Sequence, residues 1–348
     1  MDIELKPGRM RTVAARVATF AGALALLAAP AAFAQDAAAG SAAGSAAGSA
    51  AEGAAFAPRA AKPSPFAART MILAAAHAGE RIVTVGDRGV VLLSDDRGRT
   101  WRQSAGVPAD AMLTALSFAD ARHGWAVGHW GTILHTADGG ETWSVQRVDT
   151  AEDRPLFSVH FSDPQNGIAV GLWALMLRTR DGGRSWEEAE LPAAPGESRA
   201  DANLMHIFQS PRGDLFIAGE RGSVLRSTDG GETWSWRPTG YRGTFWSGTA
   251  LDDGTLIVAG LRGSVYRSAD HGDSWQSTGG ATRSSITDLA QLDGRVLAVG
   301  LDGVSLESSD RGQTFTARQR EDRLGLTAVL AVEGKALVFS RNGVLPEQ

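Results

Sequence analysis

Six aspartates recur along the 348-residue chain at nearly regular intervals, and carboxylates are the groups with which most glycoside hydrolases cleave their substrates. Each lies in an octapeptide of the form Ser/Thr-x-Asp-x-Gly-x-x-Trp/Phe, and successive aspartates are 42, 43, 48, 41 and 40 residues apart. A carboxylate in a tight turn accepts backbone N–H groups from the residues just ahead of it, which fixes the turn. Because every octapeptide repeats the same chemistry, we expect a structural role for all six. They are Asp96, Asp138, Asp181, Asp229, Asp270 and Asp310.

Two tyrosines and seven histidines are the other residues whose chemistry could build an active site. A sialidase uses a tyrosine nucleophile with a nearby glutamate. Tyr241 has no glutamate close to it in the sequence, and Tyr266 takes a place that leucines fill in other repeats. The histidines lack zinc-binding spacing, and the octapeptides lack the alternating ligands of a calcium loop. We therefore predict no catalytic residue, no metal site and no cofactor, and keep a secreted glycoside hydrolase as the alternative.

A repeat of about forty residues is typical of propeller blades. Upstream of each octapeptide lies a second marker, a turn of the type hydrophobic-Gly-x-x-Gly, and a seventh copy occupies residues 339–343. The sequence thus predicts an all-β, seven-bladed β-propeller with four-stranded antiparallel blades. The seventh blade shows only three strands, and propellers leave no long open edge. We expect the N-terminal arm around Ser64–Arg69 to supply the missing strand and close this last blade.

The chain begins with features of a secretory signal. Residues 1–34 combine a basic start with an uncharged stretch that ends on a small-x-small site, which predicts cleavage before Gln35. The 18 uncharged residues 17–34 approach the length of a membrane span, so a retained anchor stays the alternative. Residues 35–63 are predicted as an Ala/Gly/Ser-rich flexible linker and extended arm, and residues 64–348 as the propeller. We expect a periplasmic or secreted protein, and the formal charge of −5 argues against nucleic-acid binding.

The turns between second and third strands differ from repeat to repeat, unlike the octapeptides. In a propeller these turns share one face, and the octapeptides, between third and fourth strands, share the other. We interpret the two variable residues of each marker as the centre of the turn, which displays several arginines and tryptophans in a circle. These residue types dominate interface hot spots, and exposed tryptophans are not explained by solubility. We therefore predict a partner-binding face made of Arg88, His129, Trp130, Trp173, Arg221, Arg262 and Arg341.

Two segments, VTVGDRGVVLLSDDRGRTW at 83–101 and GWAVGHWGTILHTADGGETW at 124–143, resemble the photosynthesis system II assembly/stability factor family of Asp-box propellers. The resemblance extends from about residue 66 to the end of the chain. It implies a non-enzymatic, lumenal or periplasmic scaffold that holds an unassembled membrane protein through an arginine-rich patch. The positions matching that patch are Arg88, Arg221, Arg262 and Arg341. Trp130 and Trp173 depart from it, because another charged residue is expected at their places.

These observations lead us to expect an exported, monomeric scaffold that binds a membrane-protein partner through the predicted face. The partner is either a photosystem-like subunit or an envelope transporter, because relatives of this kind also occur in bacteria without photosystems. A role in photosynthesis therefore does not follow from the residues alone. A carbohydrate-binding propeller that stacks sugars on Trp130 and Trp173 is a further alternative. From here on, the octapeptides are called Asp boxes.

Overall fold

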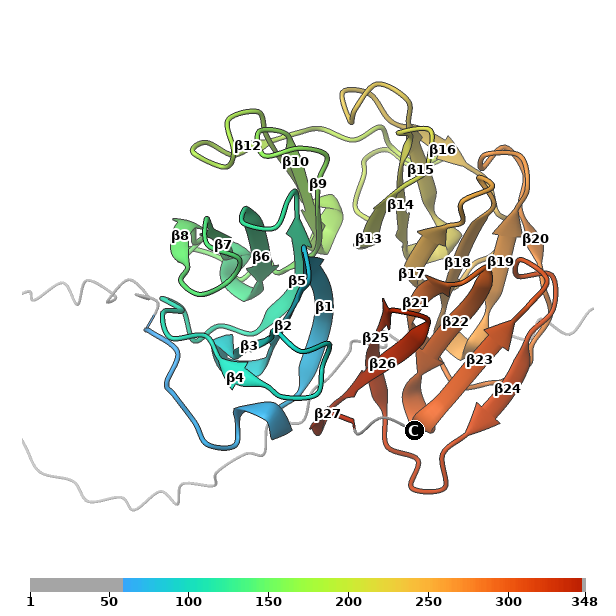
Figure 1. Ribbon diagram of the computed structural model, residues 1–348. Helices are drawn as coiled ribbons and strands as arrows, with labels where there is room; N and C mark the ends of the chain where they lie inside the picture. Colours follow the sequence, from blue (N-terminus) through green and yellow to red (C-terminus); the bar gives the residue numbers. More distant parts are fainter. Residues whose placement is uncertain (1–58, 346–348) are drawn as a thin grey trace, which may run out of the picture. The chain divides into compact units, whose positions relative to one another are not determined.

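The computed structural model describes residues 59–345, which all belong to one unit, Ala54–Gln348. The predicted signal peptide and nearly all of the predicted linker lie outside the described residues. Seven sheets follow one another along the chain and surround a common centre (Figure 1). Within this part of the chain, no helix is long and apolar enough to cross a membrane.

Six of the seven sheets have four antiparallel strands in the order of the sequence, running from the centre of the ring to its rim. Blade 1 holds β1 (Ile72–Ala78), β2 (Arg81–Gly86), β3 (Val91–Ser94) and β4 (Arg102–Gln103). Blade 2 holds β5 (Leu113–Phe118), β6 (Gly124–Gly128), β7 (Ile133–Thr136) and β8 (Ser144–Arg147). Blade 3 holds β9 (Leu156–Phe161), β10 (Gly167–Gly171), β11 (Met176–Thr179) and β12 (Glu187–Glu188).

The second half of the ring repeats this order. Blade 4 holds β13 (Leu204–Gln209), β14 (Leu215–Gly219), β15 (Val224–Ser227) and β16 (Ser235–Arg237). Blade 5 holds β17 (Phe245–Ala250), β18 (Leu256–Gly260), β19 (Val265–Ser268) and β20 (Gln276–Ser277). Blade 6 holds β21 (Ile286–Leu292), β22 (Arg295–Gly300), β23 (Val304–Ser308) and β24 (Thr316–Gln319). Blade 7 holds β25 (Leu326–Val332), β26 (Lys335–Ser340) and β27 (Gly343–Val344).

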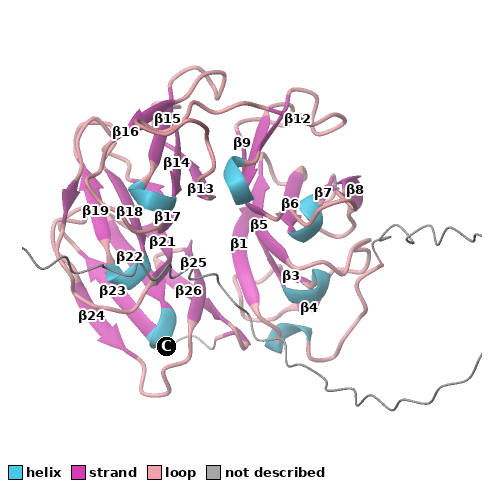
Figure 2. Cartoon of the chain, turned by 180° about the vertical axis from the view of Figure 1, so that it is seen from behind, coloured by secondary structure: helices cyan, strands magenta, loops and turns pink. Residues whose placement is uncertain are grey.

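Short 3-10 turns are the helical segments of the described chain. One precedes blade 1, and the others join the second and third strands of blades 1 to 6. In Figure 2 they are drawn in cyan and are spread around the ring. They are η1 (Ala67–Arg69), η2 (Asp87–Gly89), η3 (His129–Gly131), η4 (Leu172–Ala174), η5 (Glu220–Gly222), η6 (Leu261–Gly263) and η7 (Leu301–Gly303).

Apolar packing between neighbouring blades holds the ring together. The second strands read as continuous apolar runs because both faces are covered by adjacent blades, and β10 is buried at every position. Each Asp-box aromatic packs against the preceding blade, as Trp143 does against Val83 and Leu93 of blade 1. An Asp-box aromatic therefore lies between the blades in six of the interfaces, and the other five contact equivalent apolar residues of the preceding blade.

The ring closes between blades 7 and 1 by the same contacts that join other blades. Thr327 donates its hydroxyl to the carbonyl of Ile72, as Thr114 does to Leu156 and Thr287 to Leu326. A shared apolar cluster that includes Ile72 and Phe339 fills the interface. Within residues 59–345, closure thus rests on side-chain contacts, and no sheet contains strands from both ends of this range.

The predicted fourth strand of blade 7 is not among the strands of the described residues. Ser64–Arg69 forms a turn that includes η1 instead of an extended segment, and Thr70 donates both its N–H and its hydroxyl to Ala67. The carbonyl of Ala68 lies so close to Gly343 that a Cβ there would come within 2.0 Å. Further upstream the arm runs along blade 1, where Ala61 donates its N–H to Val107 at 2.9 Å. The arm is therefore a connecting loop, and the prediction of an N-terminal closing strand at these residues is wrong.

Candidate functional site

The turns between second and third strands share one end of the blades, which we call the turn face. In blade 1 the N–H of Val90 donates to Asp87 at 3.0 Å, so the central pair of the turn is Arg88 and Gly89. Arg88 has φ 53° and ψ 35°, and Gly89 has φ 67°. This is the mirror-image turn that matches the twist of a hairpin. The sequence interpretation was shifted by one residue, because it took Asp87 and Arg88 as the central pair.

Glycine is required at the second central position because the next loop packs on it. A Cβ on Gly89 would lie 2.0 Å from the carbonyl of Ala109, and equivalent glycines of other blades meet similar obstacles. The exception is blade 3, where Trp173 at φ 54° is followed by Ala174 at φ 57°. Two consecutive side chains in the left-handed region cost about 1–2 kcal/mol each. Hydrogen bonds from their N–H groups to Asn203 and Ala202 hold this strained turn in place.

The predicted histidine and tryptophans lie in the turns of two neighbouring blades, with His129 and Trp130 on blade 2 and Trp173 on blade 3. Trp173 is 56% exposed, whereas Trp130 is half-buried. Asp153 accepts the N–H of Trp130 at 2.7 Å and contacts Nδ1 of His129 at 3.1 Å. Of these three side chains, Trp173 therefore offers the largest free surface.

The predicted arginines fall into two groups. The Arg221 guanidinium donates to Asp201 at 2.9 Å, so its charge is largely neutralised. Arg88 is the opposite case, with a side chain that is 84% exposed and only its neighbour Asp87 within ion-pair range, at 3.5 Å. Arg262 and Arg341 are exposed and form no ion pair with any described residue.

Four more arginines belong to the turn face and were missed by the sequence reasoning. They are exposed, make no ion pair with the described part of the chain, and lie in η1 or in the loops that lead into the first strands of blades 5, 6 and 7. These loops vary in length and carry no repeated marker, so nothing in the repeat pattern indicated them. Together with the unneutralised predicted arginines they form what we call the arginine sector, over blades 5, 6, 7 and 1: Arg69, Arg88, Arg242, Arg262, Arg283, Arg323 and Arg341.

Acidic loops occupy the other half of the turn face. The loops that follow β8 and β12 contain Asp149, Glu152, Asp153, Glu190, Glu197 and Asp201. Several of them neutralise the basic residues there, as Asp149 does with Arg147 at 3.2 Å. The face is therefore divided into an arginine sector and an acidic half that also carries the two tryptophans.

A cleft of about 350 Å³ lies beside Arg221, where the long loop after β12 passes over blade 4. Its lining is mainly apolar and includes Pro195, Trp236 and Tyr241. Trp236 donates its indole N–H to Pro192 at 3.0 Å, which fixes the loop on the blade. The cleft arises from the longest interval between Asp boxes, the 48 residues from Asp181 to Asp229.

The opposite face, which we call the box face, contains the Asp boxes and the turns between first and second strands. In the first box, Asp96 accepts the Ser94 hydroxyl at 2.9 Å, the Thr100 N–H at 2.8 Å and the Thr100 hydroxyl at 2.6 Å. The same three bonds recur in the other five boxes. These donors, the hydroxyl four residues ahead first among them, lower the pKa of five box carboxyls to about 2: Asp96, Asp181, Asp229, Asp270 and Asp310.

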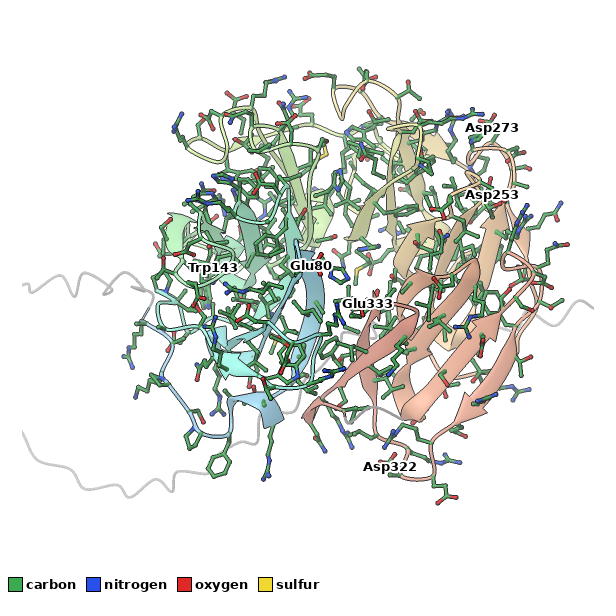
Figure 3. All side chains as sticks on the ribbon, viewed as in Figure 1. Glu80, Trp143, Asp253, Asp273, Asp322 and Glu333 are labelled. Carbon is green, nitrogen blue, oxygen red and sulfur yellow. The ribbon has the colours of Figure 1, made fainter. Side chains whose placement is uncertain are left out.

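Most of the remaining turns of the box face carry an acidic residue, and two of them also contain an arginine, Arg122 or Arg212. Glu80 and Glu333, labelled in Figure 3, belong to the first turns of blades 1 and 7. Glu333 pairs at 2.6 Å with Arg97 of the first Asp box. The other first turns contribute Asp120, Asp163, Asp253 and Asp293. Arginine is thus a central residue in three tight turns of the turn face, at Arg88, Arg221 and Arg262, whereas acidic residues predominate in the first turns of the box face.

Both tyrosines and several of the histidines have partners within the described fold. Tyr241 donates its hydroxyl to the carbonyl of Leu261 at 3.0 Å, and its ring lies 5.3 Å from that of Tyr266. Neither tyrosine hydroxyl is hydrogen-bonded to a carboxylate. Burial lowers the pKa of both His160 and His206 to about 4, and His206 accepts the N–H of Gly248 on the next blade. Among the described residues, no group of three acidic, histidine or cysteine side chains is placed to hold a metal ion.

Comparison with known proteins relates the chain to one family. Residues 103–158 and 148–325, together more than half of the chain, match the family described as photosynthesis system II assembly factor YCF48. The photosystem II stability/assembly factor HCF136 of Cyanidioschyzon merolae is 40% identical over 58 residues, which are 16% of this chain and 13% of that protein. The photosystem II assembly lipoprotein Ycf48 of Synechocystis sp. is 37% identical over 59 residues, 17% of each chain. The aligned segments therefore span less than a fifth of either curated relative.

Solved structures show the same fold. YCF48 bound to D1 peptide superposes with a TM-score of 0.65 and 20% identity, covering 83% of this chain and 95% of that one. YCF48 from Cyanidioschyzon merolae gives a TM-score of 0.63 and 18% identity, with 83% and 97% covered. At this identity the likeness concerns the architecture of the propeller.

Proposed function

Because the chain belongs to the photosynthesis system II assembly factor YCF48 family, we propose that it is an exported, non-enzymatic scaffold that docks a membrane-protein partner on the turn face. The observation that carries this proposal is the arginine sector. Its seven arginines are exposed, none is neutralised by a partner beyond its own neighbour, and all are held by one rigid ring. Charged side chains displayed in this way steer and orient an oppositely charged segment.

The partner in this proposal is a membrane protein that exposes an acidic segment before or during its assembly. A solved relative carries a D1 peptide, which supports a peptide segment as the ligand. The residues proposed to contact it are Arg88, Arg262 and Arg341 of the predicted set, joined by the arginines of the loops. Trp173 extends the contact as an exposed aromatic anchor. Arg221 contributes less, because Asp201 already occupies its guanidinium.

Export belongs to the same proposal. It rests on the basic start and apolar stretch of residues 1–34 and predicts a mature protein that begins at Gln35. N-terminal sequencing of the protein recovered from a periplasmic extract checks the cleavage. A retained N-terminus would replace the proposed secreted form with an anchored one.

The test of docking is a pull-down of membrane-protein partners with three arginines reversed in charge, Arg88→Glu, Arg262→Glu and Arg341→Glu. The matched control reverses three exposed arginines of the box face, Arg99→Glu, Arg184→Glu and Arg212→Glu, which also lack ion pairs with described residues. We expect partner recovery to fall at least tenfold with the first set and to stay within twofold with the second. Equal recovery with both sets would refute the turn face as the docking surface.

A further inference from the structure

One interface of the ring lacks an element that the other six possess. Between blades 6 and 7 the buried cluster has only three fully buried members, Val299, Leu326 and Val329, and it contains no Asp-box aromatic. Every other interface includes one such Trp or Phe. The cause is that blade 7 has no Asp box, so nothing from it reaches back over blade 6.

The consequence is an uncovered apolar side chain on blade 6. Three residues before the end of each second strand lies an apolar residue that the next blade's box covers, as Gly312 covers Ile257 and Gly98 covers Leu337. Six of these seven residues are buried: Val83, Trp125, Ile168, Phe216, Ile257 and Leu337. The seventh, Leu297, is the one that remains partly exposed.

The backbone beside Leu297 has a free sheet edge. β27 is the outermost strand of blade 7 within the described chain, whereas the other six third strands each pair with a fourth. Leu345 donates its N–H to Val338 on β26, so the N–H and carbonyl of Val344 point to the outer side by the alternation of an antiparallel ladder. In three other blades the carbonyl equivalent to that of Val344 accepts an N–H from just beyond the fourth strand: Val91 from Ser104, Met176 from Ala189 and Val265 from Thr278.

From these observations we propose that the outer edge of blade 7, together with Leu297, binds an extended acidic segment of the partner that carries one aromatic side chain. The segment adds the fourth strand to blade 7, hydrogen-bonds to Val344 and places its aromatic ring over Leu297. We call the outer edge of β27 together with Leu297 the seat. The other blades of this chain indicate the form of the ligand, because in each of them a turn, a short strand and a Trp or Phe occupy the equivalent position. The proposal rests on the proposed function for the class of the partner and adds where and how its segment is held.

Two exposed arginines on the turn-face side favour an acidic residue in the segment, whereas Asp293 and Glu333 border the interface on the box-face side. Arg318 in β24 and Arg341 in the turn before β27 lie on either side of the interface, are exposed, and form no ion pair with any described residue. Arg341 also belongs to the arginine sector, so the edge of blade 7 continues the surface on which the partner docks. The described N-terminal arm packs Ala68 against Gly343, and its upstream part leads away from the outer edge of β27, since Ala61 is hydrogen-bonded to Val107 beside blade 2.

The probe for the experiment is a labelled peptide with the sequence of residues 227–237, STDGGETWSWR, which is the chain's own acidic box and fourth strand from blade 4. Binding to the full chain is followed by fluorescence anisotropy. We expect saturable binding that is lost when Trp234 of the peptide is replaced by alanine. We also expect binding to weaken at least tenfold in Leu297→Glu and severalfold in Leu297→Ala, and to be unchanged in Val145→Glu. Val145 is the matched control, an exposed apolar residue on the outer strand of blade 2.

Other results overturn the proposal. Absence of binding to the full chain would mean that the seat is already filled or fits no strand, and equal binding by Leu297→Glu would place the peptide elsewhere. A dimer that dissociates on adding the peptide, seen by sedimentation, would make a second copy the occupant. Val344→Pro removes an outward N–H and leaves Leu297 unchanged, so weaker binding by this variant guards against misfolding of the Leu297 variants as the cause. The charge reversals Arg88→Glu and Arg262→Glu lie outside the seat, so lost partner recovery with retained peptide binding separates the two proposals.

Discussion

The two faces of the propeller are built from equally tight turns but use their side chains differently. On the box face, side chains form the hydrogen bonds that hold each turn. In the second box, Thr136, Asp138 and Thr142 bond to one another and to the backbone of the same box. On the turn face, the side chains of Arg88 and Arg262 contribute no hydrogen bond to their own turns. A repeated residue therefore indicates what the scaffold needs, and a variable residue on the same scaffold is available for a partner.

Acid unfolding should show the largest effect, the contribution of the Asp-box carboxylates to the stability of the fold. Hydrogen bonds lower the pKa of five box carboxyls to about 2, below the value of about 3.9 that an unfolded aspartate has. A lowered folded-state pKa gives stability that is present above pH 4 and is lost as the pH falls toward 2. We expect the urea midpoint to drop steeply across this window, and a flat profile would contradict the assigned role of the boxes.

Removing the carboxylate of a single Asp box should lower the stability of the fold by a smaller amount. Asp138→Ala removes the acceptor of three hydrogen bonds and is expected to lower the free energy of unfolding by about 2 kcal/mol. Asp138→Asn keeps an acceptor for the Thr142 N–H and should cost about half as much. Urea denaturation of the two variants side by side checks the order.

One carboxylate on β21, the innermost strand of blade 6, should make the stability of the fold depend on pH in the opposite direction. Asp288 joins three blades by accepting the Ser247 hydroxyl at 3.1 Å and the Val329 N–H at 2.9 Å, yet burial raises its pKa to about 6. A raised folded-state pKa gives stability that is complete below pH 4 and is lost as the pH rises through 6. Asp288→Asn should flatten the thermal melting temperature between pH 4 and pH 7, and an unchanged slope would exclude Asp288 as its source.

The strained turn of blade 3 offers a gain in stability on the turn face. Ala174→Gly relieves the left-handed strain but frees the unfolded chain, so we expect a net stabilisation of about 0.5 kcal/mol. Ala290→Gly in β21 is the control, because an extended alanine has no such strain to relieve and should be destabilised. A loss of stability in both variants would show that the turn of blade 3 is relaxed.

The smallest effect belongs to the arginines. Arg262→Ala should change the free energy of unfolding by no more than about 0.5 kcal/mol, because the side chain is exposed and bonded to nothing in the fold. Thermal melts of this variant and of Asp138→Ala, compared directly, measure the difference between the two faces. A destabilisation equal to that of the box variant would remove the distinction.

Much of this architecture could be predicted from the sequence repeats, and each difference between prediction and structure has a physical cause. Seven blades were predictable because each needs the same turn chemistry at a fixed interval. The arm before blade 1 was mistaken for a strand because the sequence shows that an edge is open but not where the arm crosses it. Arg242, Arg283 and Arg323 escaped notice because they lie in loops of irregular length, and the neutralisation of Arg221 by Asp201 depends on how one such loop folds back. Local repetition thus predicts the scaffold, whereas the surface depends on contacts between loops.

Within residues 59–345 every sheet of this ring is assembled from consecutive strands, and the seam between blades 7 and 1 is joined by packing and by bonds such as that of Thr327 to Ile72. Each described blade can therefore form from strands that follow one another directly in the chain. Contacts between near neighbours in sequence favour rapid folding. This order of assembly limits the time during which unpaired strands are exposed to aggregation.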